Sequence, residues 1–376
     1  MHALARLPRI IATLAACGVA VLLFAFLLEL AGYDSLAALR ALWMGSFGTS
    51  HALTSATLVR ATPLILTGLA VALAFKAGIW NIGADGQLVM GAAAAAACAI
   101  VAGDSMGRAA LPAALFVGTL AGALWAGIAA LLRRKAGVLE VISTIMLNFL
   151  ALNAVSYLVR GPLQEPLRIY PQTASIAADA RLPTLISGAR VSWGLILALA
   201  SAVALWWWLT RTASGFRVRI AGANPDAARV AARIDVGRVT TRVFLASGAF
   251  AGLAGAIEVT GVTFALYENI SPGYGYTAIA VALLARLNFL LVIASGLFFA
   301  ALESGGLAMQ RDAGVPSVVV SVVEGAVILA TMLAARGWGI GRNWRQRGGP
   351  PPNNEDTRRS PAAHHPIPSV AVESSQ

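Results

Sequence analysis

The sequence predicts an all-α polytopic membrane protein, and its composition and its apolar runs carry this prediction. Of the 376 residues, 58% are hydrophobic and only 12% are charged, whereas soluble domains carry about 25% charged residues. Apolar stretches of about 20 residues, the length that crosses a bilayer as a helix, recur along the chain. These stretches are continuous, as in GAAAAAACAIV at residues 91–101. They lack the alternation that a membrane β-barrel requires, so we expect helices.

The apolar runs predict about ten membrane segments, with roughly 8 to 10 as the range because some runs are short for a full crossing. The segments near residues 80–100 and 274–302 are the short ones, and they could be re-entrant. The candidate spans are residues 10–30, 57–75, 87–102, 110–132, 138–159, 193–210, 243–266, a short 274–285, 289–302 and 315–335.

The distribution of basic residues predicts the orientation. With the N-terminus inside, 20 of the 28 Arg and Lys residues fall in cytoplasmic segments and 8 fall outside. Basic residues collect on the cytoplasmic side of membrane proteins, so we expect both termini to be cytoplasmic. The same rule explains the net charge of +11 without a nucleic-acid partner.

The segments outside the apolar runs do not resemble an enzyme domain, and no metal site is expected in the chain. Residues 336–376 are rich in Gly, Pro, Arg and Ser, which predicts a disordered cytoplasmic tail. The connection 160–191, with prolines and glycines among mixed charges, is predicted to be an ordered external loop. The four histidines are scattered and the two cysteines lie in apolar runs, so no metal site is expected.

A basic connection at residues 211–242 contains a pattern typical of a short capped helix. Asn224 is a good N-cap, Pro225 suits the first helical position, and Asp226 favours the positive end of the helix dipole. Spacing of i, i+3, i+4 and i+7 predicts an apolar face of Ala227, Val230, Ala231 and Ile234, with Arg229 and Arg233 opposite. Such a helix is either a docking element or a surface helix on lipid headgroups.

The stretch KAGIWNIGADGQLVMG at residues 76–91 interrupts the apolar pattern with glycines and with Asn81, Asp85 and Gln87. Irregular backbone at membrane depth is tolerated only inside protein or beside a watery cavity, and in transporters it often contacts the solute. The alternative is an ordinary tight hairpin at the inner surface, which Lys76 marks.

Polar side chains also fall inside predicted spans. Asn148 and Asn153 lie in the span 138–159, Thr144 shares a helix face with Asn148, and Glu258 lies in the span 243–266. Buried polar groups indicate either a solute pathway or hydrogen bonds between helices. The pairs Gly118/Gly122 and Gly248/Gly252 are typical of close helix packing and require no further function.

No motif for catalysis or nucleotide binding is present. The sequence lacks the G-x-x-x-x-G-K-[ST] phosphate loop, H-E-x-x-H and G-x-S-x-G. The chain is therefore not expected to be an enzyme or to hydrolyse ATP itself.

Several stretches together resemble one known family. WNIGADGQLVMGA at residues 80–92 is similar to the "FNIGAEGQ" signature of inner-membrane permeases for branched-chain amino acids, ribose and other simple sugars, and nucleosides. FRVRIAGANPDAARVAARID at residues 216–235 resembles that family's cytoplasmic segment, and residues 146–162, 255–288 and 301–329 also match. The likeness covers about residues 60–335 and is strongest to the nucleoside and simple-sugar branch.

The resemblance implies the permease subunit of an ATP-driven (ABC) importer in the bacterial cytoplasmic membrane, with residues 1–335 as its transmembrane domain. It implies a cytoplasmic ABC ATPase, a second permease subunit, identical or not, and an extracytoplasmic solute-binding lipoprotein. ATP is then bound by a partner and the chain has no cofactor of its own. The implied ATPase-coupling helix comprises Arg217, Gly222, Asn224, Pro225, Asp226, Arg229, Arg233 and Ile234.

Two residues depart from the family pattern. Asp85 stands where Glu is usual, which keeps the charge with a shorter reach. Arg233 stands where Gly commonly precedes Ile234, which adds a charge at the implied docking surface.

The mechanism expected from the resemblance is alternating access, in which ATP binding by the partner moves the coupling helices. As a hypothesis, the solute pathway is lined by Asn81, Asp85, Gln87, Asn148, Asn153 and Glu258, whose hydrogen bonds suit sugars or nucleosides. An ion-coupled secondary transporter or channel that needs no ATPase is the alternative. A membrane scaffold is a third, which the buried polar groups disfavour.

Overall fold

The computed structural model describes residues 22, 24–230, 233–316, 318, 319, 322 and 325. Throughout these residues the regular structure is helical, and the extended backbone forms only two isolated bridges, Gln172↔Tyr267 and Thr184↔Ser192. The prediction of an all-α chain is therefore confirmed.

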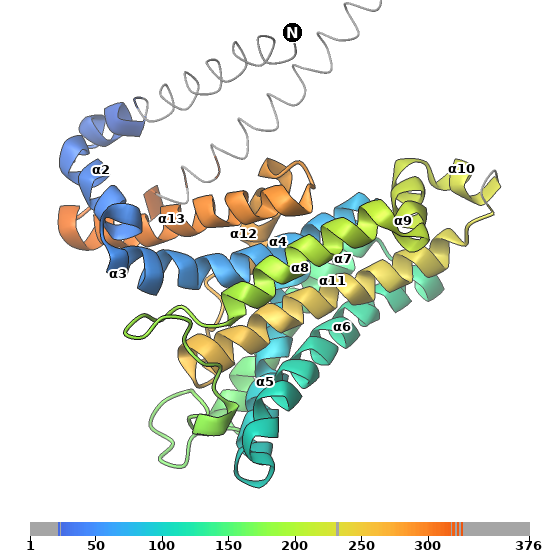
Figure 1. Cartoon of the computed structure of the whole chain (residues 1–376), viewed down its shortest axis with the longest axis horizontal. Coiled ribbons are helices and arrows are strands. Elements are labelled where there is room, and N and C mark those ends of the chain that lie inside the picture. Colours follow the sequence, from blue (N-terminus) through green and yellow to red (C-terminus); the bar gives the residue numbers. More distant parts are fainter. Residues whose placement is uncertain are drawn as a thin grey trace, which may run out of the picture. The chain divides into compact units, whose positions relative to one another are not determined.

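Seven helices in the described part of the chain are long and apolar enough to cross a membrane. Each corresponds to a predicted span, which the hydrophobic pattern therefore located correctly (Figure 1). They are α4 (Leu58–Lys76), α5 (Ala84–Met106), α6 (Ala110–Ala136), α7 (Glu140–Arg160), α8 (Gly194–Arg211), α11 (Val236–Glu258) and α13 (Phe289–Ala313).

The remaining helices are shorter. The predicted segment 274–285 forms α12 (Tyr274–Leu284), an apolar helix below the length of a full span. The predicted segments 10–30 and 315–335 fall largely outside the described residues, as does the predicted tail 336–376. The other short helices are α2 (Ser35–Trp43), α3 (Ser50–Ala52), α9 (Ala213–Ala223) and α10 (Pro225–Val230). Single helical turns form η1 (Met44–Gly48), η2 (Leu53–Thr57), η3 (Gly107–Ala109), η4 (Ala178–Ala180) and η5 (Val259–Thr263).

One predicted boundary was wrong by more than two turns. The span predicted to end at residue 302 continues to Ala313, so that α13 is 25 residues long. The polar and glycine-rich stretch at residues 303–306 does not end the helix, and Gly305 lies against Leu42 and Ser46. Close packing against α2 and η1 (Met44–Gly48) keeps this polar and glycine-rich segment helical.

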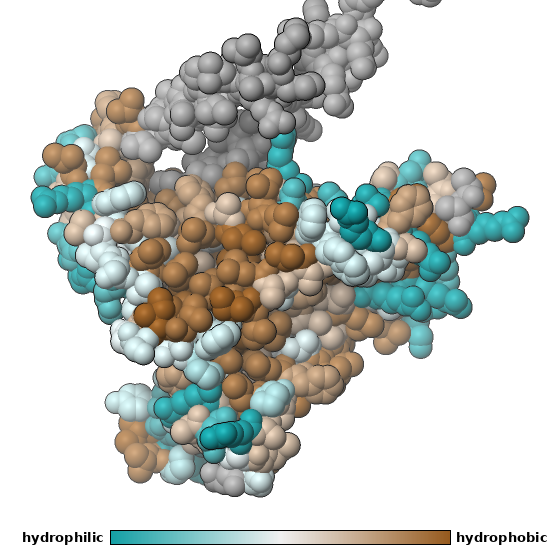
Figure 2. Space-filling model, viewed as in Figure 1, coloured by the Kyte–Doolittle hydropathy of each residue, from teal (hydrophilic) through white to brown (hydrophobic). Residues whose placement is uncertain are grey.

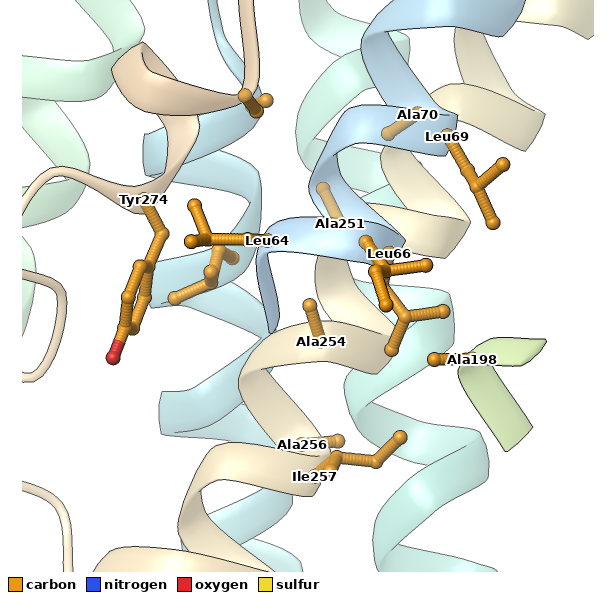
Figure 3. Packing of buried hydrophobic residues seen from close by; sticks show 14 of the residues in the cluster. Leu64, Leu66, Leu69, Ala70, Ala198, Ala251, Ala254, Ala256, Ile257 and Tyr274 are labelled. Carbon is orange, nitrogen blue, oxygen red and sulfur yellow. The ribbon is translucent and has the colours of Figure 1, made fainter. Parts of the chain in front are cut away.

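Helix α4 lies at the centre of the bundle and is packed on several sides. It contacts α8, α11, α12 and α13, and nearly all of its residues are buried. Figure 3 shows Leu66 of α4 beside Ala254 of α11, with Ala198 of α8 close by. Because α4 is apolar all round, it fits an enclosed position better than one that faces lipid on one side.

The predicted small-residue pairs bring three helices into close contact. Gly118 and Gly122 of α6 face Gly248 and Gly252 of α11, and Gly91 of α5 also touches Gly252. A Cβ atom added at Gly122 would collide with the backbone of Gly248 and Gly252. The backbones of α6 and α11 can therefore meet only because both positions lack side chains.

The connection between α7 and α8 is ordered, as expected. Its backbone pairs with the segment after α11, through Thr173 N to Leu266 O (3.0 Å) and Leu182 N to Thr260 O (2.8 Å). Arg160, at the end of α7, forms an ion pair with Glu268 at 2.6 Å. Hydrogen bonds from Arg160 and Ser156 hold the pKa of Glu268 below its usual value.

The surface shows where the polar segments gather. On the face in Figure 2, hydrophobic residues cover the middle of the bundle, while hydrophilic residues gather at its margins, including the end that carries α9 and α10. An apolar band between polar margins is what a bilayer requires of a spanning protein.

Candidate functional site

Asn81 and Gln87 form the centre of a buried polar network beside the turn between α4 and α5. The Asn81 amide donates to Gln87 Oε1 (3.0 Å) and accepts from Gln87 Nε2 (3.0 Å). Asn81 Nδ2 also donates to Ser247 Oγ (2.9 Å), and Ser247 donates to Ala70 O (2.7 Å). Side chains from three segments therefore satisfy one another with almost no exposure to solvent.

Asn148 connects α7 to the same turn. Its Oδ1 accepts from Gly86 N (2.9 Å), and its Nδ2 donates to Ile82 O (2.9 Å) and to the Tyr276 hydroxyl (3.2 Å). Asn148 is fully buried and uses both ends of its amide on other segments. It therefore satisfies backbone groups that the interrupted helix would otherwise leave unpaired.

Asp85 joins the first helix break to a second one, which includes residues 271–273 and directly precedes α12. Its Oδ1 accepts from Ser271 Oγ (2.7 Å) and from Gly275 N (3.0 Å). Gly275 is the second residue of α12, so the carboxylate lies where the first backbone N–H groups of a helix need acceptors. Ser271 in turn accepts from Gly273 N and Tyr274 N.

Four of the six predicted pathway residues thus meet in one network: Asn81, Asp85, Gln87 and Asn148. Their hydrogen bonds among the described residues join separate helices, as in the interhelical alternative that the sequence left open. Ser247, Ser271 and Tyr276 complete the network and were not singled out from the sequence. The SPGYG motif at residues 271–275 was a signal for Ser271, although it gave no hint of its partner Asp85.

The other two predicted pathway residues lie elsewhere. Asn153 is exposed on α7, with its amide donating to Phe149 O one turn earlier (2.8 Å). It is a polar group in an exposed apolar stripe of the same helix that includes Met146, Phe149 and Tyr157. Glu258, the last residue of α11, is buried, and its Oε2 has no hydrogen-bond partner among the described residues.

The basic connection 211–242 folds as two short helices ahead of α11. Thr212 caps α9 by accepting from Gly215 N, and Asn224 Oδ1 accepts from Asp226 N (3.1 Å) and Ala227 N (3.0 Å). The predicted capping of the helix that starts at Pro225 is therefore confirmed. Asp226 forms an exposed ion pair with Arg229 at 3.2 Å.

Two of the four positions predicted for the apolar face of this helix were wrong. Val230 is 82% exposed and Ala227 is exposed as well, whereas Ile234 is half-buried and Ala231 lies outside the described residues. Ala228 is buried instead, against Ala221 of α9 and Val236 of α11. The small side chain of Ala228 allows close contact within the connection.

The rest of the predicted coupling residues divide into one packing residue and several exposed ones. Gly222 lies against the backbone of Lys76 and Ala77, so the connection is fixed to the end of α4. Arg217 and Arg229 are exposed, and Ile234 is half-buried beside Ala228. Arg233 has a φ of 49°, a left-handed conformation that favours glycine.

Within the described residues, no group of three His, Cys, Asp or Glu side chains is placed to hold a metal ion. What the arrangement provides is a joined pair of helix breaks inside the bundle and a polar helical projection at one end of it.

The chain matches a family model described as branched-chain amino acid transport system, permease component, over residues 53–333. It is 43% identical to a glucose ABC transporter permease of Haloferax volcanii over 72% of this chain and 74% of that protein. It is 36% identical to a guanosine ABC transporter permease of Bacillus subtilis, over 81% and 88% of the two chains.

A nucleoside ABC transporter permease of Lactococcus lactis is 30% identical over 82% of this chain and 86% of its own. No solved structure shows a significant match. The relatives are transport components, in agreement with the seven apolar helices. The chain therefore belongs to the family of branched-chain amino acid transport system permease components, and it is a permease subunit of an ABC importer, a multi-pass protein of the cytoplasmic membrane.

Proposed function

We propose that this subunit imports nucleosides or simple sugars by alternating access, driven by a separate ABC ATPase. The observation that carries the substrate class is the 30 to 43% identity, over most of the chain, to permeases named for guanosine, nucleosides and glucose. These solutes are rich in hydroxyl and amide groups, which hydrogen-bonding side chains can recognise.

The ATPase docks on α9 and α10, which are cytoplasmic in this proposal. The geometry supports this role because the two helices project from the bundle while Gly222 fixes them to the end of α4. A push on the exposed surface of Arg217, Arg229 and Val230 can therefore reach the core helix directly. The buried Ala221, Ala228 and Val236 make α9, α10 and the start of α11 one unit.

A second permease subunit covers the exposed stripe of α7. An amide exposed to lipid is costly, so Asn153 is better placed against protein or in a water-filled path. The pathway then runs along this stripe, with Asn153 as a contact for the solute. The network of Asn81, Asp85, Gln87 and Asn148 lies behind it and holds the two helix breaks together.

The network residues join the pathway in this proposal when the bundle changes state. Asn148 contacts both breaks, through Gly86 and Tyr276, so a shift of α12 against α5 would release amide and carboxylate groups for the solute. Glu258 lies apart from this network. In this proposal it contributes to the solute pathway at the end of α11 opposite Val236.

Uptake by the complex tests the proposal. The complex purified from native membranes with a tagged version of this chain is reconstituted in vesicles with its solute-binding protein and ATP. We expect accumulation of radiolabelled guanosine or glucose, with unlabelled solute of the same class competing and leucine not competing. Accumulation of leucine with no competition by either class would contradict the substrate assignment.

A cross-linking experiment tests the docking site separately. Val230→Cys places a thiol on an exposed residue of α10, and Arg108→Cys places one in the distant exposed turn η3 (Gly107–Ala109) as a control. We expect a short bifunctional reagent to link only the first variant to the ATPase. Equal linking of both variants would remove α10 as the docking site.

A further inference from the structure

A cavity of about 490 Å³ lies apart from the polar network. Its walls come from η1, α3 and η2 (Leu53–Thr57), the first turn of α4, the residue Arg190 ahead of α8, and the second half of α13. It shares no residue with the Asn81 network. Arg60 precedes Lys76 by 16 helical residues, so the cavity is about 24 Å along α4 from the end that bears the α9–α10 projection.

The cavity wall is strongly basic. Arg60, Arg190 and Arg311 line it together with His51, and Asp312 is its one acidic residue. Asp312 already holds Arg311 in a two-point ion pair, at 2.7 and 3.0 Å. Within the described part of the chain, the guanidinium groups of Arg60 and Arg190 form no ion pair or hydrogen bond.

Both of these arginines lie near the buried carboxyl group of Glu258, yet neither forms an ion pair with it within the described residues. Arg60 lies within an apolar helix long enough to span the membrane. Ionisable side chains within membrane segments are costly and therefore rare, and where they occur they usually mark a functional site.

Hydroxyl groups line the same cavity. Ser304 is 4% exposed, and its Oγ has no hydrogen-bond partner among the described residues. Ser55 is also buried and accepts from Arg190 N at 3.2 Å, which leaves its own hydrogen available for donation. Buried hydroxyl groups normally have partners, so the vacant donor of Ser304 indicates a ligand or water at this wall.

We propose that this cavity binds an oxyanion of the phosphate class. Guanidinium groups present several N–H donors in a plane. These donors and their positive charge match the oxygens of a phosphate group better than they match an uncharged solute. Arg60 and Arg190 supply the charge, and Ser304 supplies a hydroxyl donor from the opposite helix, α13. The volume lies within the range of small-molecule sites, about 300–1,000 Å³.

The phosphate group has two possible sources, a free phosphate compound or the headgroup of a phospholipid at the membrane surface. In either case the ligand joins the 44–60 segment, Arg190 and α13, and so stabilises these elements against one another. The site is separate from the proposed path of uncharged nucleosides and sugars.

Thermal unfolding of the full-length protein tests the site. In uncharged detergent, the probes are inorganic phosphate and glycerol phosphate at constant ionic strength. In nanodiscs, the comparison is phosphatidylcholine alone against phosphatidylcholine with phosphatidylglycerol. The variants are Arg60→Gln, Arg190→Gln and Ser304→Ala, and Arg108→Gln is the control because it is an exposed arginine outside the cavity.

We expect wild type and the Arg108→Gln control to be stabilised by a phosphate probe, and each cavity arginine variant to need about tenfold more probe for the same shift. A response to soluble phosphate identifies a free anion, whereas a response only to phosphatidylglycerol identifies a lipid headgroup. Phosphate also stabilises proteins by exclusion from their surface, so the difference between variants is the readout. Equal responses of wild type, Arg190→Gln and Arg108→Gln to every probe would overturn the proposal. Arg190 lies in an exposed loop, so its variant remains informative if Arg60→Gln does not fold.

Discussion

The carboxylate of Asp85 accepts a hydrogen bond from the hydroxyl of Ser271, at 2.7 Å and 186 positions away in sequence. This contact joins the break ahead of α5 to the break ahead of α12. Removing the carboxylate by Asp85→Ala leaves Ser271 and Gly275 N without their buried acceptor, which we expect to lower stability by about 2–3 kcal/mol.

Thermal unfolding in detergent measures this loss, and Ser271→Ala with the double variant completes a double-mutant cycle. We expect the sum of the stability losses in the two single variants to exceed the loss in the double variant by about 1 kcal/mol or more, because the two residues share one hydrogen bond. Strict additivity would show that the contact contributes nothing to the folded state.

Asn148 and Asn153 lie on the same helix and should respond differently to removal of their amides. Asn148→Leu leaves Gly86 N and Ile82 O unpaired, so we expect a loss of about 2 kcal/mol or more. Asn153→Leu removes an exposed amide, so we expect unchanged stability in detergent together with reduced solute uptake. Unchanged uptake by Asn153→Leu, at normal expression, would exclude it from the pathway.

Gly122→Val should separate α6 from α11. The added side chain meets the backbone of Gly248 and Gly252, which cannot move aside as a flexible side chain can. We expect a loss of more than about 3 kcal/mol or failure to fold. Gly127→Ala on the same helix meets only the side chain of Leu245 and serves as the control. Thermal unfolding and yield in the membrane fraction compare the two, and equal behaviour would refute close packing.

Arg233→Gly should stabilise the connection between α10 and α11. Arg233 occupies a left-handed conformation at φ 49°, which costs a residue with a side chain about 1 kcal/mol relative to glycine. We expect slower hydrogen exchange in residues 225–240 and a small rise in melting temperature. A fall in stability would show that the Arg233 side chain has a contact that outweighs this strain.

The contact between Arg160 and Glu268 should weaken in acid. The pKa of Glu268 is lowered by its hydrogen bonds from Arg160 and Ser156, so the folded state binds its proton less readily than the unfolded state does. This contribution to stability is present above the unfolded pKa of about 4.3 and is lost as pH falls through the lower folded pKa. Hydrogen exchange of residues 264–270 between pH 3 and pH 7 measures it. Glu268→Gln should exchange faster at neutral pH and lose this pH dependence, and an unaltered pH dependence would contradict the assignment.

The sequence predicted the elements of the fold better than their contacts. Continuous apolar runs located all seven long helices, because the bilayer imposes their length. The capping of α10 was also predictable, because Asn224 and the two backbone N–H groups that donate to its side chain lie within four residues of one another. The continuation of α13 to Ala313 was not, because it depends on α2 and η1 from the other end of the chain.

The candidate site shows the same division. Asn81, Asp85, Gln87 and Asn148 were identifiable as polar groups in apolar surroundings, yet their partners Ser247 and Ser271 are distant in sequence. No local spacing reports such pairs. The burial of Ala228 in place of Ala227 and Val230 was not predicted, because it depends on contacts with Ala221 of α9 and Val236 of α11 that helical periodicity does not report.

The central claim is that a separate ATPase drives transport through this subunit, and uptake with and without that partner tests it most directly. Vesicles holding the complete complex are compared with vesicles holding this chain alone, each with ATP and magnesium on the side of α9 and α10. We predict accumulation of labelled guanosine or glucose only in the complete complex and only with ATP. Accumulation by this chain alone, driven by a proton or sodium gradient, would contradict the account and identify an ion-coupled transporter.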